Sequence, residues 1–483
     1  MSAAPHAACL VGVLLPPSVG GALVNIALQW LGKIPVNLNY TASAESLESA
    51  CRQCGINHVI SAEAFLEKVK MDSPRPTILL EHLRTEITAW SRCVGFLWAA
   101  CLPSVLIERL LGAPRGRSQE DLATVVFSSG SEGEPKGVML THRNLASNIE
   151  ATLQVFPHDS NDGIMGVLPF FHSMGFMGTL WLPLTSGARA VYHPNPLDAR
   201  AIGALIYKHK ATFFMTTSTL LQGFIRQCPP EHLSSLKYIV CGAEKLADRV
   251  REACKEKFGI EPIEGYGTTE CSPLVSLNVP NFRVPGFFQR GTKVGTVGHP
   301  IPGVSVRIVN LPDGAPVGVN ESGMMLVEGP NVMQGYLGKP EKTASVLRDG
   351  WYETGDIASV DEDGFITITG RLSRFSKIAG EMVPHGKVEE SLHQLLGLTE
   401  VAETLAVVGL PDERKGEKLV VLHTLDEDQM GVLQEKLKQS NLPNLWVPAP
   451  NAFHRIDAIP VLGSGKMDLR GLKTLAEQLE NSP

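Results

Sequence analysis

The residues from Ser128 to Gly137 have the composition of a phosphate-binding loop, Ser-Ser-Gly-Ser-Glu-Gly-Glu-Pro-Lys-Gly. This loop follows the apolar run Thr124–Phe127, which is typical of a buried strand. Glycines allow backbone N–H groups to converge on an anion, hydroxyls add donors, and Lys136 supplies a mobile positive charge. The loop is not a Walker motif, in which the lysine directly follows the second glycine. We therefore predict a phosphate cradle, followed by a helix that begins after Thr141, a residue type preferred at the N-cap.

Four further stretches accompany this loop. In chain order they are Gly265–Glu270, Tyr352–Asp356, the pair Gly370 and Arg371, and Pro460–Lys466. The five motifs in this order resemble the adenylate-forming, or AMP-binding, superfamily, which includes acyl- and aryl-CoA synthetases, peptide-synthetase adenylation domains and luciferases. The resemblance covers nearly the whole chain from about Leu10 onward. It disfavours the alternative for the first loop, a surface turn rich in glycine and serine.

Within this superfamily, three stretches are most similar to the acyl-carrier-protein synthetase half of bacterial bifunctional 2-acylglycerophosphoethanolamine acyltransferases. They are Ser128–Gly133, His193–Asp198 and Lys377–Val383. The resemblance implies an enzyme that activates a fatty acid with ATP and Mg²⁺ and then transfers the acyl group to a thiol.

The pattern of apolar segments predicts an α/β fold. Strands and helices alternate from Ala8 to Ile60, which indicates a parallel sheet with crossover helices. Short strands separated by Gly and Pro between Gly295 and Glu328 predict a small β-rich subdomain. Residues 1–371 would form a large N-terminal adenylation domain that lacks the first strand and helix usual in the family. Residues 372–483 would form a small, mobile α+β lid.

The composition and net charge of the chain disfavour some classes of binding partner. A net charge of −7 over 483 residues argues against nucleic acid, because no basic stretch is concentrated enough to follow a phosphate backbone. Nine scattered cysteines and no secretory segment are typical of a reducing cytoplasm. The C-x-x-C pair Cys51 and Cys54 is interpreted as packing, because no second pair accompanies it for a zinc site.

One apolar stretch, Cys93–Ile107, does not belong to any of these motifs. It is too short to span a bilayer, which takes roughly 20 residues, and Pro103 interrupts it. With Arg92 before it and Trp98 within it, the stretch could lie in a membrane interface. A buried or partner-facing hairpin explains it equally well. Both interpretations stay open, and the first would place a cytoplasmic protein at the periphery of the inner membrane.

The resemblance assigns roles in ATP binding. The phosphate cradle would comprise Ser128, Ser129, Gly130, Ser131, Gly133 and Lys136. The adenine would lie against Gly242, Ala243 and Glu244, and Tyr266 would stack on it, within the motif that also contains Gly265, Gly267 and Thr268. Asp356 would accept hydrogen bonds from the ribose with the help of Arg371.

The resemblance also assigns the catalytic groups. Attack of a carboxylate on the α-phosphorus brings two anions together, so cations and donors must offset the charge. Glu270 would ligate Mg²⁺, which prefers hard oxygen ligands, and Thr269 would donate to the α-phosphate. Lys466 would neutralise charge in the transition state, and His172 would border the acyl pocket and position the substrate carboxylate.

The resemblance also implies that in the second half-reaction the small domain rotates and opens a pantetheine tunnel. The pivot would fall at Ser373, a position that is commonly Asp or Lys in the family, and Gly380 would border the tunnel. Acyl carrier protein is the leading acceptor, and CoA is the alternative. A non-catalytic nucleotide- or acyl-binding subunit is the alternative from another class. Acyl transfer to a lysophospholipid is disfavoured, so a separate acyltransferase would be a partner.

Overall fold

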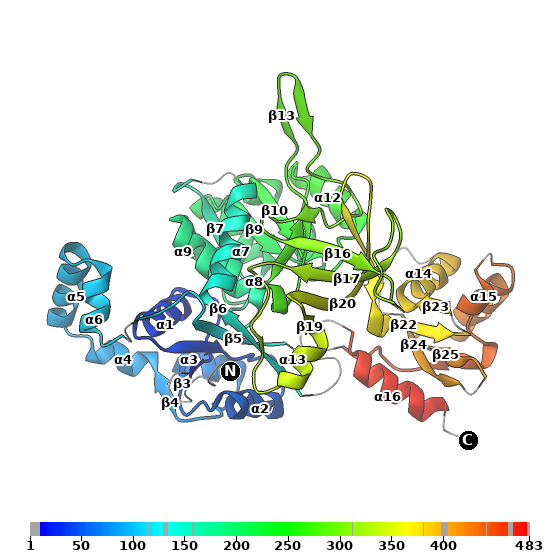
Figure 1. Cartoon of the computed structure of the whole chain (residues 1–483), viewed down its shortest axis with the longest axis horizontal. Coiled ribbons are helices and arrows are strands. Elements are labelled where there is room, and N and C mark those ends of the chain that lie inside the picture. Colours follow the sequence, from blue (N-terminus) through cyan, green and yellow to red (C-terminus); the bar gives the residue numbers. More distant parts are fainter. Residues whose placement is uncertain are drawn as a thin grey trace.

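The chain folds as a large N-terminal domain of mixed sheets and helices and a smaller C-terminal domain (Figure 1). The computed structural model describes residues 10–113, 116–128, 134–156, 159–311, 313–379, 381–397, 404–412, 414–440, 442–461 and 467–480. The predicted α/β fold with a β-rich subdomain and a small lid is confirmed. No helix among these residues is long and apolar enough to cross a membrane.

The first sheet is parallel, as the alternation of segments predicts, with strand order β2-β1-β3-β4. Its elements are β1 (Leu10–Val13), α1 (Val19–Trp30), β2 (Ile34–Asn37), α2 (Ala44–Cys54), β3 (Val59–Ser61), α3 (Glu63–Val69) and β4 (Thr77–Leu79). Serine N-caps begin both long helices, because a hydroxyl can accept from a free backbone N–H of the first turn. Cys51 and Cys54 are buried in the core of this unit, and burial raises the pKa of Cys51 to about 11 and that of Cys54 to about 12.

A seven-stranded sheet of order β15-β12-β11-β10-β9-β7-β8 forms the centre of the large domain. Its strands are β7 (Gly163–Gly166), β8 (Arg189–Tyr192), β9 (Phe213–Thr216), β10 (Tyr238–Cys241), β11 (Ile263–Gly267), β12 (Leu274–Leu277) and β15 (His299–Pro300). The strands from β8 to β11 are parallel, and β12 and β15 add antiparallel neighbours. Around the sheet run α7 (His142–Val155), α8 (Ser173–Gly175), α9 (Leu182–Ser186), α10 (Ala199–His209), α11 (Ser218–Gln227) and α12 (Asp248–Phe258). The carboxyl ends of these parallel strands are where such sheets bind ligands.

The predicted phosphate loop joins two antiparallel strands. β5 (Leu122–Ser128) is the predicted buried strand, and β6 (Lys136–Thr141) is a second strand that the sequence did not predict. They pair from Leu122↔Thr141 to Ser128↔Lys136, and β18 (Gly335–Tyr336) adds to the other edge of β6. The predicted N-cap at Thr141 is confirmed, because its side chain accepts from the Asn144 N–H while the Asn144 side chain accepts from the Thr141 N–H.

The predicted β-rich subdomain is an antiparallel sheet. It contains β16 (Ser305–Val309), β17 (Gly323–Glu328), β19 (Leu347–Arg348), β20 (Trp351–Val360) and β21 (Ile366–Arg371), with α13 (Pro340–Val346) beside it. The register of β20 and β21 places Asp356 opposite Arg371.

The C-terminal domain is the small α+β unit that the sequence predicts. Its elements are β22 (Phe375–Ile378), β23 (Glu381–Pro384), α14 (His385–Leu396), β24 (Leu405–Asp412), β25 (Gly416–His423), α15 (Glu427–Lys438), β26 (Phe453–Arg455) and α16 (Leu469–Glu480). The sheet has the order β23-β22-β25-β24, and β26 pairs with β25.

Two segments project from the large domain (Figure 1). One is α4 (Leu80–Glu86), α5 (Ala89–Cys101) and α6 (Ser104–Leu110), which lie at the left edge of the view. The other is the hairpin of β13 (Phe282–Val284) and β14 (Phe287–Gln289) at the top. Every residue of α5 is exposed or partly exposed, so the interpretation of this stretch as a buried hairpin is wrong.

One histidine of the C-terminal domain is buried in its neutral form. His385 begins α14, is 4% exposed, and its Nε2 lies 2.8 Å from the Ser376 hydroxyl. Burial, with a smaller contribution from the charge of Arg374, lowers the pKa of His385 from 6.5 to about 3. The helix N-terminus also disfavours an imidazolium there. The folded domain therefore excludes a proton that the unfolded chain accepts.

We predict that the C-terminal domain loses stability as the pH falls from about 6.5 toward 3, because only the unfolded chain protonates His385 in that window. Between pH 6.5 and 4.5 this group should contribute a loss of about 2 kcal/mol. A His385→Gln variant should remove that part of the pH dependence. Hydrogen exchange of peptides from β22 to β25, corrected for the intrinsic rate, measures it. His82→Gln, at an exposed histidine of α4, is the matched control. An unchanged pH dependence in His385→Gln would contradict the assignment.

Candidate active site

The buried carboxylate of Asp356 connects three strands, β11, β20 and β21, near the carboxyl end of β11. Asp356 of β20 is 2% exposed. The Tyr266 hydroxyl donates to its Oδ2, and Nε of Arg371 donates to its Oδ1 at 2.8 Å. Burial and then the charge of Asp356 raise the pKa of Tyr266 well above its ordinary value, so its hydroxyl stays a donor. The structure thus brings together the predicted adenine and ribose residues.

A second cluster connects the end of the phosphate loop to the predicted magnesium ligand. The Tyr336 hydroxyl donates to Oε1 of Glu270 at 2.9 Å. Nζ of Lys136 lies 5.4 Å from the centre of the Tyr336 ring, within the range of a cation–π contact. Burial and then the negative charge of Glu270 raise the pKa of Tyr336, which keeps the hydroxyl protonated. One side chain therefore contacts both predicted phosphate-site groups.

The Glu270 carboxylate fits the coordination habits of Mg²⁺. One of its oxygens is oriented by Tyr336, and its backbone oxygen accepts from the Met333 N–H at 2.7 Å. Mg²⁺ usually takes one or two carboxylates and completes its shell with water and substrate phosphates. Among the described residues no group of three His, Cys, Asp or Glu side chains could hold a metal by itself. Glu270 would hold Mg²⁺, which would neutralise charge on the phosphates.

The segments that carry the predicted catalytic residues Thr269 and His172 come together in the structure. The Ser173 hydroxyl lies 3.5 Å from that of Thr269, which places the start of α8 beside the motif after β11. His172 is exposed at the N-cap of α8, and its ring centre lies 4.6 Å from that of Phe171. Phe171 is itself buried against Tyr40. His172 thus lies beside a pair of packed aromatic rings.

The predicted adenine segment is a strained turn after β10. Ala243 has φ of 68°, a left-handed conformation that residues with a Cβ rarely adopt. The Gly242 N–H donates to the Thr216 oxygen at 3.1 Å, and the Glu244 carboxylate accepts from the Thr219 N–H at 2.5 Å. In the adjacent motif, a Cβ on Gly267 would lie 2.2 Å from the Pro273 oxygen, so only glycine fits there.

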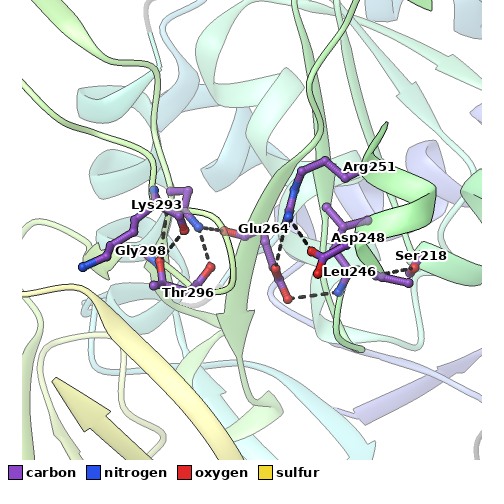
Figure 2. Close-up of polar contacts among 10 residues, drawn as sticks. Ser218, Leu246, Asp248, Arg251, Glu264, Lys293, Thr296 and Gly298 are labelled. Carbon is purple, nitrogen blue, oxygen red and sulfur yellow. Dashed lines mark hydrogen bonds and ion pairs between the residues drawn. The ribbon is translucent and has the colours of Figure 1, made fainter. Parts of the chain in front are cut away.

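A buried ion pair connects β11 to the residues that follow the turn after β10 (Figure 2). Glu264 of β11 accepts from the Leu246 N–H at 3.0 Å and faces Arg251 of α12 at 3.4 Å. The Arg251 side chain is 4% exposed and also pairs with Asp248 at 2.8 Å. Burial raises the pKa of Glu264, against the opposing effects of the Leu246 N–H and Arg251. The pair fixes the turn after β10 relative to the strand that carries Tyr266.

The backbone of Glu264 continues the same network toward the other side of the strand. Its oxygen accepts from the Asn278 N–H at 3.0 Å and from the Asn278 side chain at 3.1 Å. The Asn278 side chain also accepts from the Lys293 N–H and donates to the Thr296 oxygen. Lys293 and Thr296 lie on the left of Figure 2. The network therefore connects α12, β11 and the base of the β13–β14 hairpin.

Glu134 belongs to the part of the phosphate loop that the structure describes, and its side chain ties this part to two other segments. Its Oε1 accepts from the Ser49 hydroxyl at 2.6 Å, and its Oε2 pairs with Lys339 at 3.2 Å. The Ser49 and Lys339 contacts lower the pKa of Glu134. This acidic side chain is therefore engaged by α2 and by the segment before α13.

Several predicted residues lie outside the described residues. They are Ser129, Gly130, Ser131, Gly133, Gly380 and Lys466. The residues on either side of the Lys466 loop are described: Val461 pairs with Met467, and the Met467 sulfur lies 3.5 Å from Nη1 of Arg374. Arg374 also forms an ion pair with Glu389 of α14. The loop thus starts and ends beside the segment that follows the predicted pivot Ser373.

Sequence reasoning missed Tyr336, Glu264 and Arg251. Tyr336 meets Glu270 across 66 positions of the chain, so no local spacing predicts the contact. Glu264 precedes the Gly265–Glu270 motif directly, and a charged residue inside an otherwise apolar strand was the available signal.

A cavity at the opposite ends of the central strands shares none of the predicted residues. Phe156, Ile164, Phe213 and Tyr238 line it, and the ion pair of Lys237 with Asp162 at 2.7 Å lies at its rim. These residues lie at the amino ends of the strands, whereas the clusters around Asp356 and Glu270 lie at the carboxyl ends.

The chain is similar to proteins of known sequence. A sequence model of the family described as AMP-binding enzyme matches residues 6–337. The long-chain-fatty-acid–CoA ligase of Bacillus subtilis (strain 168) is 32% identical over 98% of this chain and 86% of that protein. The protein of the same name from Salmonella typhimurium is 28% identical over 84% of this chain and 75% of that protein. The feruloyl-CoA synthase of an Amycolatopsis species is 33% identical over 72% and 68% respectively.

Solved structures share the fold. The o-succinylbenzoate CoA synthetase of Bacillus subtilis, solved with an acyl-adenylate intermediate, superimposes with a TM-score of 0.75 and 22% identity over 96% of this chain and 88% of that chain. ATP-bound MatB of Rhodopseudomonas palustris superimposes with a TM-score of 0.72 and 23% identity over 98% and 89%. These matches support the two-domain architecture.

We predict that Glu264→Gln weakens AMP binding about tenfold and lowers the free energy of unfolding by about 1–3 kcal/mol. The reason is that Arg251 keeps its buried charge with one partner fewer, and the Leu246 N–H loses a charged acceptor. Calorimetric titration with AMP and urea unfolding measure the two effects. Asp248→Asn is the matched control, because it removes the other partner of Arg251 from a side chain that is 80% exposed, and its effects should be smaller. Equal effects of the two variants would refute the role given to burial.

Proposed function

Because the chain belongs to the family of AMP-binding enzymes, we propose that it activates a long-chain fatty acid with ATP and Mg²⁺ and transfers the acyl group to CoA. The observation that carries the choice of substrate is the 32% identity to a long-chain-fatty-acid–CoA ligase over 98% of the chain. The class of reaction, an AMP-forming ligation of an acid to a thiol, is common to the relatives named above. It is the class that the five ordered motifs predict.

The described residues support the first half-reaction in distinct ways. Asp356 has both oxygens oriented by neighbours and would accept from the ribose hydroxyls, while the strained turn at Ala243 would present backbone atoms to adenine. Lys136 would contact the phosphates beside the Glu270 carboxylate, which would hold Mg²⁺. Lys466 would approach the attacked phosphorus and offset the charge that develops there.

The acceptor distinguishes two versions of this function. Similarity of the three stretches around Ser128, His193 and Lys377 to carrier-protein synthetases favours acyl carrier protein. The relatives that match over most of the chain are named CoA ligases, and this favours CoA. We take CoA as the acceptor and carrier protein as the competing one. A non-catalytic subunit is disfavoured, because Tyr336 orients Glu270 beside Lys136, as a working phosphate site requires.

We predict ATP–pyrophosphate exchange that depends on a long-chain fatty acid and on Mg²⁺. Glu270→Gln and Lys466→Ala should each reduce the exchange by at least a hundredfold, because Glu270 would hold the Mg²⁺ that offsets the phosphate charge and Lys466 would offset charge in the transition state. Lys245→Ala, on an exposed lysine after the adenine turn, is the control and should retain exchange. Lack of exchange in the unmodified protein with every chain length would favour the non-catalytic alternative.

The acceptor is tested by discharging the acyl-adenylate with free CoA or with holo acyl carrier protein. We expect thioester to form at least tenfold faster with CoA at equal thiol concentration. The reverse order would reject CoA as the acceptor and leave the adenylation step intact.

We also propose that the boundary between domains follows Arg371 and that rotation about Ser373 separates the half-reactions. Ser373 lies in the short 3-10 turn Leu372–Arg374, directly after β21. Phe375 packs with Leu372 against the subdomain residues Met324 and Ile357, so the turn lies on the contact between the two domains. A pivot requires freedom at one φ, ψ pair more than a particular side chain.

Ser373→Pro should therefore separate the two half-reactions. Proline fixes φ near −65°, which suits the turn seen here and restricts the alternative arrangement. Pyrophosphate exchange should stay within a few fold of normal, while thioester formation falls at least tenfold. Ser373→Ala removes the same hydroxyl without the backbone restriction and should change neither rate. A proline variant with normal thioester formation would place the pivot elsewhere.

A further inference from the structure

The helical arm, residues Leu80–Leu111 with α4, α5 and α6, exposes an apolar surface that the proposed function does not use. Trp90 is 76% exposed and Phe96 is 73% exposed, and further apolar side chains of the arm are exposed with them: Ile87, Leu97, Val105, Leu106 and Leu110. In α6, Ile107 is the buried residue. Figure 1 shows α5 and α6 at the edge of the molecule, away from both domains.

The size of this surface is unusual for a chain in water. Aromatic side chains offer roughly 150–250 Å² each, so Trp90 and Phe96 together expose about 300 Å². The exposed aliphatic side chains of the arm extend this area beyond the largest patches of a typical monomer, about 300–600 Å². A helix that exposes so much apolar surface needs an apolar environment, because propensity alone does not stabilise thirteen residues in water.

The distribution around α5 favours a fluid environment over a flat protein partner. At about 100° per residue, Trp90, Val94 and Leu97 share one side, whereas Phe96 lies about 120° away from Trp90. The narrow remaining strip holds Ser91, Arg92, Gly95 and Ala99. A single rigid partner covers one side of a helix, but acyl chains can surround this wide apolar sector and leave the narrow strip at the surface.

The charged residues of the arm indicate which kind of lipid surface it contacts. The part of the arm that forms α5 and α6, Ala89–Leu111, contains two arginines and one glutamate, a net charge of +1 within a chain of net charge −7, and over the whole arm three arginines balance three glutamates. Between Ile87 and Ile107 the single charged residue is Arg92, so the basic groups border the apolar surface and do not interrupt it. Arginine and tryptophan side chains both place an apolar body in lipid and a polar end at the headgroups. Arg92 and Arg109 therefore lie where they can meet anionic headgroups at the border of the apolar surface.

The lengths of α5 and α6 determine how deeply the arm can enter a bilayer. α5 has 13 residues and would be about 20 Å long, which is less than the roughly 30 Å of a bilayer core. α6 has 7 residues and follows after Pro103. We propose that the arm inserts into one leaflet of an anionic bilayer, with α5 in the plane of the interface and Trp90, Phe96 and Leu97 among the acyl chains. This attachment is independent of ATP and of the ligase reaction.

Sedimentation with vesicles tests the proposal on the full chain. The unmodified protein should bind vesicles of 30% phosphatidylglycerol in phosphatidylcholine at least tenfold more strongly than pure phosphatidylcholine. Replacing the apolar group by Trp90→Ser, Phe96→Ser and Leu97→Ser should reduce binding at least tenfold. The matched control is Leu197→Ser with Val319→Ser, which removes apolar side chains that are 74% and 58% exposed outside the arm, and its binding should be normal.

Two further measurements keep the outcome decisive. Arg92→Gln with Arg109→Gln should abolish the preference for anionic vesicles and keep weak binding to both. Light scattering without lipid should give the same mass for the unmodified protein and the triple variant, and equal unfolding midpoints would show that the variant is folded. Vesicle binding that the triple substitution leaves unchanged, or no binding by the unmodified protein, would overturn the proposal. So would a dimer that the triple variant converts to monomer, since a second copy would then be the occupant.

Discussion

Burial of the Asp356 carboxylate is the constraint on which the nucleotide site depends. A carboxylate at 2% exposure is tolerable only when donors compensate for the water it has lost. Tyr266 and Arg371 supply those donors from β11 and β21, so the central sheet and the β-rich sheet must meet at this point. In turn, the charge of Asp356 raises the pKa of the Arg371 guanidinium. The carboxylate predicted to bind the ribose therefore also fixes how the two sheets are placed.

The other residues predicted to bind the nucleotide lie in the same region because the carboxyl ends of neighbouring parallel strands lie on the same side of the sheet. The adenine turn follows β10 and the Tyr266 motif ends β11, and the buried pair of Glu264 with Arg251 holds these adjacent ends in register. The phosphate loop comes from a different sheet, through β5 and β6. It is connected to the magnesium ligand by Tyr336, whose strand β18 pairs with β6. Three sheets thus carry the residues predicted to contact adenine, ribose and phosphate, one group from each sheet.

The sequence predicted the architecture well, since alternation, glycine-rich turns and N-cap residues are local signals. The first sheet is parallel as the alternation predicts, and Thr141 caps α7 as expected. β6 was missed because it directly follows a loop whose glycines and proline indicate a turn. For the site, the motifs identified which residues to expect, but not their mutual contacts. Tyr336 and Arg251 act through partners that are distant in sequence or approach from another element, and no periodicity encodes such contacts.

The two half-reactions impose opposite demands on the contact between the domains. Adenylation needs a cation brought close to the phosphates, and thioester formation needs the same space for a thiol arm. Arg374 lies where these demands meet, because it contacts Met467 beside the lysine loop and pairs with Glu389 of α14. Glu389 in turn accepts from the Val407 N–H at 2.6 Å, so these contacts fix the ends of that loop to the sheet of the small domain. If the lysine moves, it therefore moves with the whole C-terminal domain about the turn after Arg371. A rigid lid on one flexible turn is the simplest mechanical way to exchange a catalytic cation for an acceptor thiol.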